Sequence, residues 1–214
     1  MNILILNTSE LTGGAAVAAN RLAKALGKSG VEVSMLVRDR KTGDERVTAL
    51  NDSFWASRWN FIRFVWERLI IFICNHFRRK PLFQVSIANT GTDLSDHPLV
   101  KAADVIHLHW INQGFLSLAD IRKLALIGKP IVWTMHDMWP CTAICHYSFG
   151  CERFKKECGE CPFLSSSDKK DLSYHVFNKK RFLADSKIQL VAVSTWLRQQ
   201  AQDSALTNRL PVEV

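Results

Sequence analysis

Blocks of apolar and polar residues alternate at the start of the chain and predict a strand, a helix and a second strand. Residues 2–6 form a short apolar run that is typical of a buried strand. After a polar turn, apolar residues recur at helical spacing over residues 15–26, and residues 31–37 supply the next apolar run. These segments predict a βαβ unit with parallel strands and a right-handed crossover.

The same alternation continues toward the end of the chain. Apolar runs predict further strands at residues 105–110, 130–135 and 188–193, and helices at residues 117–127, 172–183 and 195–202, the last capped by Ser194. Residues 210–214 begin another extended segment, and we expect the sequence to be cut there at a boundary. Alternating strands and helices predict an α/β fold: a doubly wound, Rossmann-like, mostly parallel sheet with helices on both faces.

The size of the chain favours one domain over residues 1–214. With 214 residues and 47% apolar content, the chain is long enough to bury a substantial core. The most apolar stretch is interrupted by charged residues, and the first residues lack the pattern of a secretory leader, so a cytoplasmic protein is expected. The net charge of +8 favours phosphate-bearing partners, although solvated lysines on helix faces explain it equally well.

An aromatic and basic segment begins at Phe54, ends at Lys80 and should form one or two helices that stop near Pro81. Two interpretations remain open for it. Aromatic residues flanked by arginines suit a helix that lies in a lipid headgroup layer, which would give peripheral contact with a membrane. The commoner alternative is that the aromatic residues pack on the sheet while the arginines face water.

Gly13 and Gly14 occupy the turn between the first predicted strand and its helix. Missing side chains let a ligand approach the backbone there, and exposed amides at a helix start favour an anion such as a nucleotide phosphate. The surrounding residues match neither the dinucleotide fingerprint nor the Walker pattern, and packing alone explains such a pair equally well.

Polar residues follow two later strands. His136 and Asp137 come after an apolar run, where the carboxyl end of a buried parallel strand would place them at a ligand-binding edge. A neutral imidazole there can bind a sugar hydroxyl while a nearby carboxylate fixes its tautomer; the alternative is a histidine that caps a loop. His107 and His109 should share one face of their strand, and with His136 and Asp137 they would form a metal-dependent hydrolase site, unless they are hydrogen-bonded edge residues.

Five of the six cysteines lie in one loop after the strand at residues 130–135. Four of them have spacings that favour a structural zinc ion: Cys145, Cys151, Cys158 and Cys161. A cytosolic location disfavours disulfides, although disulfides and free thiols both remain alternatives.

Several of these segments together resemble the amino-terminal domain of family 4 glycosyltransferases of the GT-B fold, in a bacterial branch that acts in surface polysaccharide synthesis. The resemblance spans nearly the whole chain and rests on these segments: residues 7–16, 105–110, 134–140, 145–162 and 193–197. It implies an acceptor-side lobe, with a second, nucleotide-sugar-binding lobe expected after Val212, and sugar transfer with retention of configuration and no catalytic cofactor.

For single residues, the resemblance implies that Gly13 and Gly14 contact the diphosphate of the donor and that His136 contacts the transferred sugar. We therefore predict substrate-binding residues in Gly13, Gly14, His109 and Trp110, and catalytic residues in His136 and Asp137. The acceptor would be a glycan or a lipid-linked hydroxyl, and the 214 residues alone should be inactive. A non-catalytic, zinc-stabilised binding module is a further alternative, but nucleic acid is not expected because the aromatic residues lie in apolar runs.

Overall fold

One seven-stranded sheet organises the molecule, with the strand order β3-β2-β1-β4-β5-β6-β7 and every neighbouring pair parallel. The computed structural model describes residues 1–79, 82–166 and 168–214. The strands are β1 (Asn2–Ser9), β2 (Glu32–Asp39), β3 (Val47–Ala49), β4 (Val105–Leu108), β5 (Ile131–Met135), β6 (Ile188–Ala192) and β7 (Val212–Glu213). The predicted parallel α/β sheet is confirmed.

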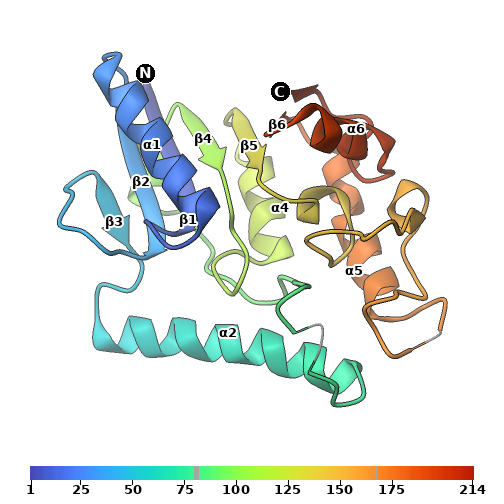
Figure 1. Cartoon of the computed structure of the whole chain (residues 1–214). Coiled ribbons are helices and arrows are strands. Elements are labelled where there is room, and N and C mark those ends of the chain that lie inside the picture. The colour runs from blue at the N-terminus through green and yellow to red at the C-terminus, as the bar shows by residue number, and fades with distance from the viewer. Residues whose placement is uncertain (80–81, 167) are drawn as a thin grey trace.

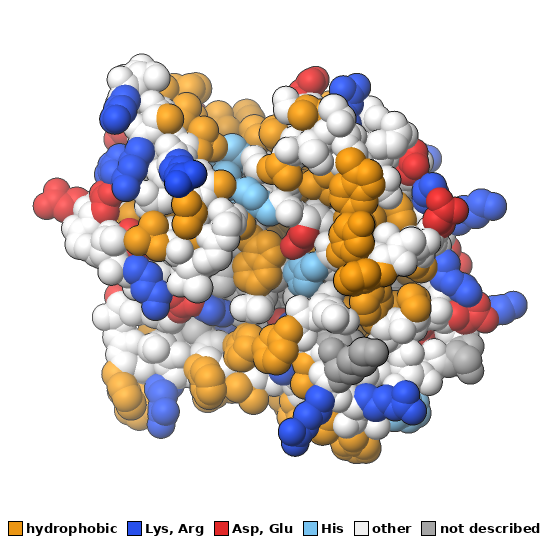
Figure 2. Space-filling view, in the orientation of Figure 1, with side chains coloured by type: hydrophobic (Ala, Val, Ile, Leu, Met, Phe, Trp, Pro, Cys, Tyr) orange, Lys and Arg blue, Asp and Glu red, His pale blue; other side chains and the backbone are white. Residues whose placement is uncertain are grey.

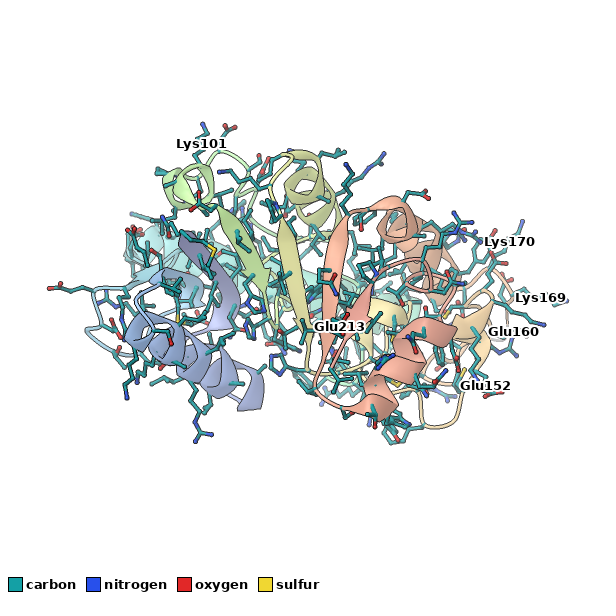
Figure 3. All side chains as sticks on the ribbon, turned by 90° about the horizontal axis from the view of Figure 1, so that it is seen from above. Lys101, Glu152, Glu160, Lys169, Lys170 and Glu213 are labelled. Atoms are coloured by element: carbon teal, nitrogen blue, oxygen red, sulfur yellow. The ribbon has the colours of Figure 1, made fainter. Side chains whose placement is uncertain are left out.

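Helices cover both faces of this sheet (Figure 1). They are α1 (Gly14–Lys28), α2 (Phe54–Cys74), α3 (Pro98–Ala102), α4 (Leu118–Leu126), α5 (Leu172–Lys180) and α6 (Thr195–Asp203), with short 3-10 helices at Trp139–Cys141, Arg153–Lys155 and Arg181–Asp185. Figure 3, seen from above, shows α1 and α6 on one side of the sheet, with α4 and α5 on the other. The same view shows Lys169 and Lys170 projecting outward beside the cysteine-rich loop.

Side chains alternate along β1 and bury both of its faces. Ile3 and Ile5 pack in a cluster with the α1 residues Ala19 and Ala23, whereas Leu6 belongs to the larger core on the opposite face. A parallel sheet covered on both faces needs such continuous apolar strands. The apolar runs in the sequence therefore marked the strands correctly.

Four short or displaced elements differ from the predictions. The sequence did not indicate β3 or α3, because runs of three and five residues carry too little periodicity. The predicted helix at residues 172–183 ends at Lys180 and continues as a 3-10 turn. The segment that begins at Phe54 forms one helix that ends at Cys74; Lys80 and Pro81, where its end was expected, lie outside the described residues.

Helix α2 also contradicts one interpretation of its own sequence. Trp55, Trp59 and Trp66 are exposed, so the expectation that the aromatic residues of this segment pack on the sheet is wrong for all three. Three of the four buried residues of the helix are polar, Ile71 being the fourth, and two of them, Glu67 and Arg68, bind backbone groups of the neighbouring loop. Nowhere in the described residues does a helix combine the length and the apolar character needed to cross a bilayer.

The chain changes direction between β1 and β4. From β1 it moves outward through β2 and β3, then returns past β1 to build β4 to β7 on the other side. Open α/β sheets bind ligands at the carboxyl ends of the strands beside such a switch point. In this chain those ends carry residues 7–9 and residues 108–110.

Candidate functional site

A cleft of about 440 Å³ opens at the switch point. Its walls come from the end of β1, the start of α1, the end of β2 and the loop after β4, and include Asn7, Thr8, Gly13, Gly14, Arg38, Lys41, Trp110 and Gln113. The structure thus brings together three of the four predicted substrate-binding residues, Gly13, Gly14 and Trp110. Figure 2 shows a hollow on this face, with histidine side chains visible within it.

The start of α1 leaves its amides open to the cleft. Gly13 precedes the helix with a φ of 91°, which favours glycine, and no side chain caps the first turn. The first turn also lacks an acidic residue, and a Cβ atom added at Gly13 or Gly14 would meet nothing within 4 Å. Free N–H groups at the positive end of a helix form a site that suits an anion.

Cationic side chains line the opposite wall of the cleft. Arg38 forms an ion pair with Asp39 at 2.5 Å and donates a hydrogen bond to the backbone carbonyl of Gln113. Lys41 is exposed, and its backbone N–H donates to the carboxylate of Glu10 at 2.6 Å. Burial alone would raise the pKa of Glu10, but hydrogen bonds from Thr42 and Lys41 hold it below its usual value. This buried carboxylate fixes the loop that carries Lys41.

Three histidines form a cluster beside the cleft. The rings of His107 and His109 lie 4.5 Å apart, so these side chains share one face of their strand as predicted. Nδ1 of His109 and Nε2 of His136 are 2.9 Å apart, and His107 is bonded to the hydroxyl of Thr134 at 2.8 Å. His109 is almost completely buried, whereas His136 is partly exposed.

Burial keeps these imidazoles neutral near pH 7. It lowers the pKa of His107 to about 4 and the pKa of His109 to about 2, with additional repulsion between the neighbouring rings. Burial also lowers the pKa of His136, although the nearby Asp137 acts in the opposite direction. A neutral imidazole carries one donor and one acceptor, so the cluster can bind a hydroxyl group without bringing a positive charge.

Asp137 binds a different set of partners from those expected. Its carboxylate accepts hydrogen bonds from Nδ1 of His146 at 2.7 Å, the indole N–H of Trp110 at 3.1 Å and the backbone N–H of Trp139 at 2.9 Å. Burial raises the pKa of Asp137, but these hydrogen bonds outweigh burial and lower it overall. The expectation that this carboxylate fixes the tautomer of His136 is wrong, because His136 is bonded to His109.

Trp110 connects the two halves of the site. Its side chain lines the cleft with Gly13 and Gly14, and its indole N–H binds Asp137. His136 and Asp137 are not among the residues that line the cleft; they lie next to it through His109 and Trp110. The glycine turn and the histidine cluster thus meet at one edge of the sheet.

A buried lysine supports the loop after β5. Lys180 is fully buried, and its ammonium group donates to the backbone carbonyls of Trp139 at 2.6 Å and Thr142 at 3.0 Å. The same group lies 3.2 Å from the centroid of the Trp139 ring, and burial lowers its pKa to about 7. Lys180 thus fixes the loop segment that follows Asp137.

Other residues of the site were not predicted from the sequence. His146 bridges Asp137 and the hydroxyl of Ser86, and an exposed aromatic pair, Tyr147 and Trp196, stacks with ring centroids 5.5 Å apart. The one sequence signal for His146 is its position directly after Cys145 in the cysteine-rich loop. Lys180 carried no signal in the sequence, because a lysine on a helix is ordinarily solvated.

The four cysteines of the predicted zinc site line one small cavity in the loop after β5: Cys145, Cys151, Cys158 and Cys161. All six cysteines of the chain are free thiols in the structure. In the described residues no three His, Cys, Asp or Glu side chains are arranged to hold a metal ion, and this includes the histidine set of the hydrolase alternative. Four soft sulfur donors around one cavity still suit zinc by their chemistry. The zinc site stays a prediction.

Comparison with known proteins decides the family. The model of Glycosyltransferase Family 4 matches residues 12–212, nearly the whole chain. The chain belongs to glycosyltransferase family 4. The predicted family membership is confirmed.

A curated relative gives a narrower likeness. Over 70 residues the chain is 33% identical to the Escherichia coli K12 protein named "Putative colanic acid biosynthesis glycosyl transferase WcaC". The match covers 32% of this family 4 chain and 17% of the relative. The chain thus resembles part of a protein that is named for colanic acid biosynthesis.

Proposed function

We propose that this family 4 chain is the acceptor-side lobe of a retaining glycosyltransferase, which moves a sugar from a nucleotide-sugar to a glycan or lipid-linked hydroxyl. The observation that carries the proposal is the cleft at the switch point, where uncapped amides of α1 lie beside a neutral histidine cluster. The colanic acid relative supports a bacterial polysaccharide as the product. The proposal places the protein in the cytoplasm.

The donor diphosphate would bind at Gly13 and Gly14. When the bond between the sugar and the diphosphate breaks, negative charge develops on the leaving phosphate oxygen. Fixed amide donors at a helix start stabilise that charge without having to reorganise. Lys41 on the opposite wall adds positive potential, whereas the ion pair with Asp39 offsets the charge of Arg38. The rest of the nucleotide-sugar would be bound by a second lobe.

His136 would bind a hydroxyl of the transferred sugar. The hydrogen bond with His109 would keep the imidazole of His136 in a single tautomer. Nε2 of His109 is buried and, among the described residues, has no hydrogen-bond partner. An N–H at that position would be an unpaired buried donor, so the proton of His109 belongs on Nδ1, from which it donates to His136. The proton of His136 then lies on its Nδ1, where it can donate to a sugar oxygen. His109 is therefore a positioning residue.

Asp137 has a supporting role in this scheme. Its carboxylate is occupied by His146, Trp110 and the backbone of Trp139, so it fixes the cleft wall and the loop after β5. Asp137 would therefore act on the sugar indirectly, by positioning the residues that it binds. Tyr147 and Trp196 offer an exposed aromatic surface near His146 on which an acceptor sugar could stack.

A transfer assay tests the proposal. The chain would be produced in its two-lobe form and incubated with radiolabelled nucleotide-sugars and membrane-extracted acceptors. Transfer with retained anomeric configuration, measured by nuclear magnetic resonance of the product, is expected. His136→Ala should lower kcat/KM by about 10²-fold, as for loss of one positioned hydrogen bond in a transition state.

The matched control is His175→Ala, because His175 is exposed on α5. Its kcat/KM should equal that of the wild type. Equal activity of His136→Ala and the wild type would contradict the proposed role of the cluster. Transfer by the 214 residues alone would contradict the division of labour between two lobes.

A further inference from the structure

Helix α2 turns its apolar side chains outward. Ten large apolar residues in or just after this helix are exposed: Phe54, Trp55, Trp59, Phe61, Ile62, Val65, Trp66, Leu69, Ile73 and Phe77. Trp55 is 79% exposed and Trp59 is 57% exposed, whereas Glu67 is completely buried. We call this surface the outer face of α2. An amphipathic helix on a water-facing surface has the opposite arrangement.

Polar contacts hold the inward face. The carboxylate of Glu67 accepts hydrogen bonds from the backbone N–H groups of Ile87 and Ala88 at 2.8 and 2.9 Å. Arg68 forms an ion pair with Glu67 at 2.8 Å and donates to the carbonyl of Val85 at 2.9 Å. The helix is therefore fixed in this orientation by buried, directional bonds. Rolling it over to bury the outer face would leave these charged groups unpaired, at a high energetic cost.

The outer face is broad. With 3.6 residues per turn, its helical positions fall within an arc of roughly 160° around the axis. Figure 2 shows hydrophobic side chains gathered along the lower edge of the molecule, where α2 runs in Figure 1. Contiguous exposed apolar surface of this kind marks a place where a soluble protein contacts another phase or partner.

Charges at this surface are of one sign. Arg58 lies within the apolar arc, with its guanidinium 5.4 Å from the ring of Phe54, and Arg78 and Arg79 follow the helix and are exposed. The only acidic residue between Phe54 and Arg79 is Glu67, which is buried. The exposed charges of this segment therefore complement a negatively charged partner.

We infer that the outer face of α2 docks on the surface of a bilayer that contains anionic lipids. Tryptophan rings suit the boundary between headgroups and acyl chains, because they combine a large apolar body with one polar N–H group. Arginine can keep its charge at the headgroups while its stem lies along apolar surface. The helix would lie in the plane of the interface without crossing it.

A second copy of the chain fits the outer face less well. Trp55, Trp59, Ile62, Trp66, Leu69 and Ile73 do follow the 4-3-4-3-4 spacing of a coiled coil. A coiled-coil seam is narrower than this arc, however, and favours branched aliphatic residues over tryptophan. Pairing two copies would also bring the cations of the two surfaces together. Charge and width both favour the lipid surface.

The position of α2 also has a consequence for sugar transfer, and this consequence rests on the proposed function. Figure 1 shows α2 running below the carboxyl ends of the strands, the edge that carries the cleft. The loop after β4 touches the helix, because a Cβ atom added at Gly114 would lie 3.1 Å from the backbone of Phe64. Docking through α2 would therefore hold the cleft near the bilayer, where a lipid-linked acceptor would be located.

Vesicle sedimentation tests the inference without any sugar donor, so a failure of the transferase proposal would not affect the result. The 214-residue chain would be mixed with vesicles of phosphatidylcholine alone or with phosphatidylglycerol. We expect the chain to sediment with the phosphatidylglycerol vesicles and its tryptophan emission to shift to shorter wavelength. Trp59→Glu combined with Trp66→Glu should weaken binding by about tenfold or more. Arg58→Glu should reduce the preference for phosphatidylglycerol.

Leu126→Glu is the matched control, because Leu126 is an equally exposed apolar residue on α4. It should bind as the wild type does. Circular dichroism and thermal melting verify folding, and Ile62→Ser with Leu69→Ser serves as an independent pair. If both folded pairs bind vesicles as the wild type does, or if the wild type never sediments with them, the inference is wrong. It is also wrong if sedimentation equilibrium shows a dimer that both pairs abolish while vesicle binding is absent.

Discussion

Gly14 lies where the first turn of α1 meets the cleft, and it distinguishes a binding role from a packing role. An added methyl group would meet no protein atom within 4 Å, so Gly14→Ala should leave the free energy of unfolding unchanged or raise it slightly. The methyl group would nevertheless occupy space beside the amides that are proposed to bind diphosphate. We expect kcat/KM for the nucleotide-sugar to fall by about 10²-fold in the two-lobe protein.

Gly27→Ala is the control for this substitution. Gly27 lies in the last turn of the same helix, and an added Cβ atom would make an ordinary contact of 3.6 Å with Arg46. Its kcat/KM should match the wild-type value. Unchanged kinetics in Gly14→Ala would mean that the glycine pair serves packing alone.

The buried histidines predict how stability responds to acid. His107 is neutral in the folded protein because burial lowers its pKa to about 4, whereas an unfolded histidine has a pKa of about 6.5. Between these values the unfolded chain binds more protons, so the free energy of unfolding falls as the pH falls from about 6.5 to 4. His107→Gln should remove part of that slope, up to about 1.4 kcal/mol per pH unit. Urea denaturation at several pH values measures it, and His175→Gln, at an exposed position, should keep the full slope.

At the scale of residues, the sequence indicated where polar groups would lie but not how they would pair. His136 and Asp137 were correctly placed after the strand β5, because an apolar run followed by polar residues defines a strand end. Their partners are His109, which follows the neighbouring strand β4, and His146, which lies further along the same loop after β5. Such pairings depend on three-dimensional packing that one sequence does not encode as a local pattern.

At the scale of elements, Lys180 makes α5 a support for the loop after β5. Burial lowers the pKa of this lysine to about 7, while an unfolded lysine has a pKa of about 10.4. Between these values the unfolded chain binds more protons, so the contribution of Lys180 to stability rises as the pH rises. The free energy of unfolding of the wild type relative to Lys180→Met should therefore increase from pH 7 to pH 9.

Lys179→Met is the matched control, since Lys179 is the exposed neighbour on the same helix. Its free energy of unfolding should follow that of the wild type at every pH. Parallel curves for the wild type and Lys180→Met would show that the ammonium group does not titrate in this range. Chemical denaturation followed by circular dichroism gives all three curves.

The cysteine-rich loop makes a separate prediction about metal. If Cys145, Cys151, Cys158 and Cys161 bind zinc, the purified chain should carry about one zinc ion per molecule, measured by plasma mass spectrometry. Cys158→Ser with Cys161→Ser should lose this zinc, because two of four ligands are gone. Cys74→Ser and His107→Gln should retain it. Zinc that is lost only with His107 would instead favour the hydrolase alternative.

Elements with a regular spacing of apolar residues were predicted well. The orientation of a helix with apolar residues on most sides was not. The apolar strands and the helix α1 follow regular spacings, and the structure confirms them. Helix α2 was predicted as a helix, but its orientation was ambiguous, because apolar residues surround most of the helix and the buried pair Glu67 and Arg68 does not stand out. Which face is inward depends on hydrogen bonds with a loop some twenty residues further along the chain.

At the scale of the whole molecule, sheet order follows from connection rules more than from any single residue. Alternating strands and helices predicted a parallel, doubly wound sheet, and the switch between β1 and β4 then fixed where a cleft would form. The edge strand β3 has only three residues and was not predicted, whereas the short edge strand β7 lies within the extended segment expected at residues 210–214. The family match over residues 12–212 agrees with this architecture.

The most direct test of the central claim is a crystal structure of the two-lobe protein with its nucleotide-sugar bound. Phosphate oxygens are expected about 3 Å from the amides at the start of α1, with the transferred sugar in contact with His136. A donor diphosphate that lies away from Gly13 and Gly14, with no contact between the sugar and His136, would contradict it.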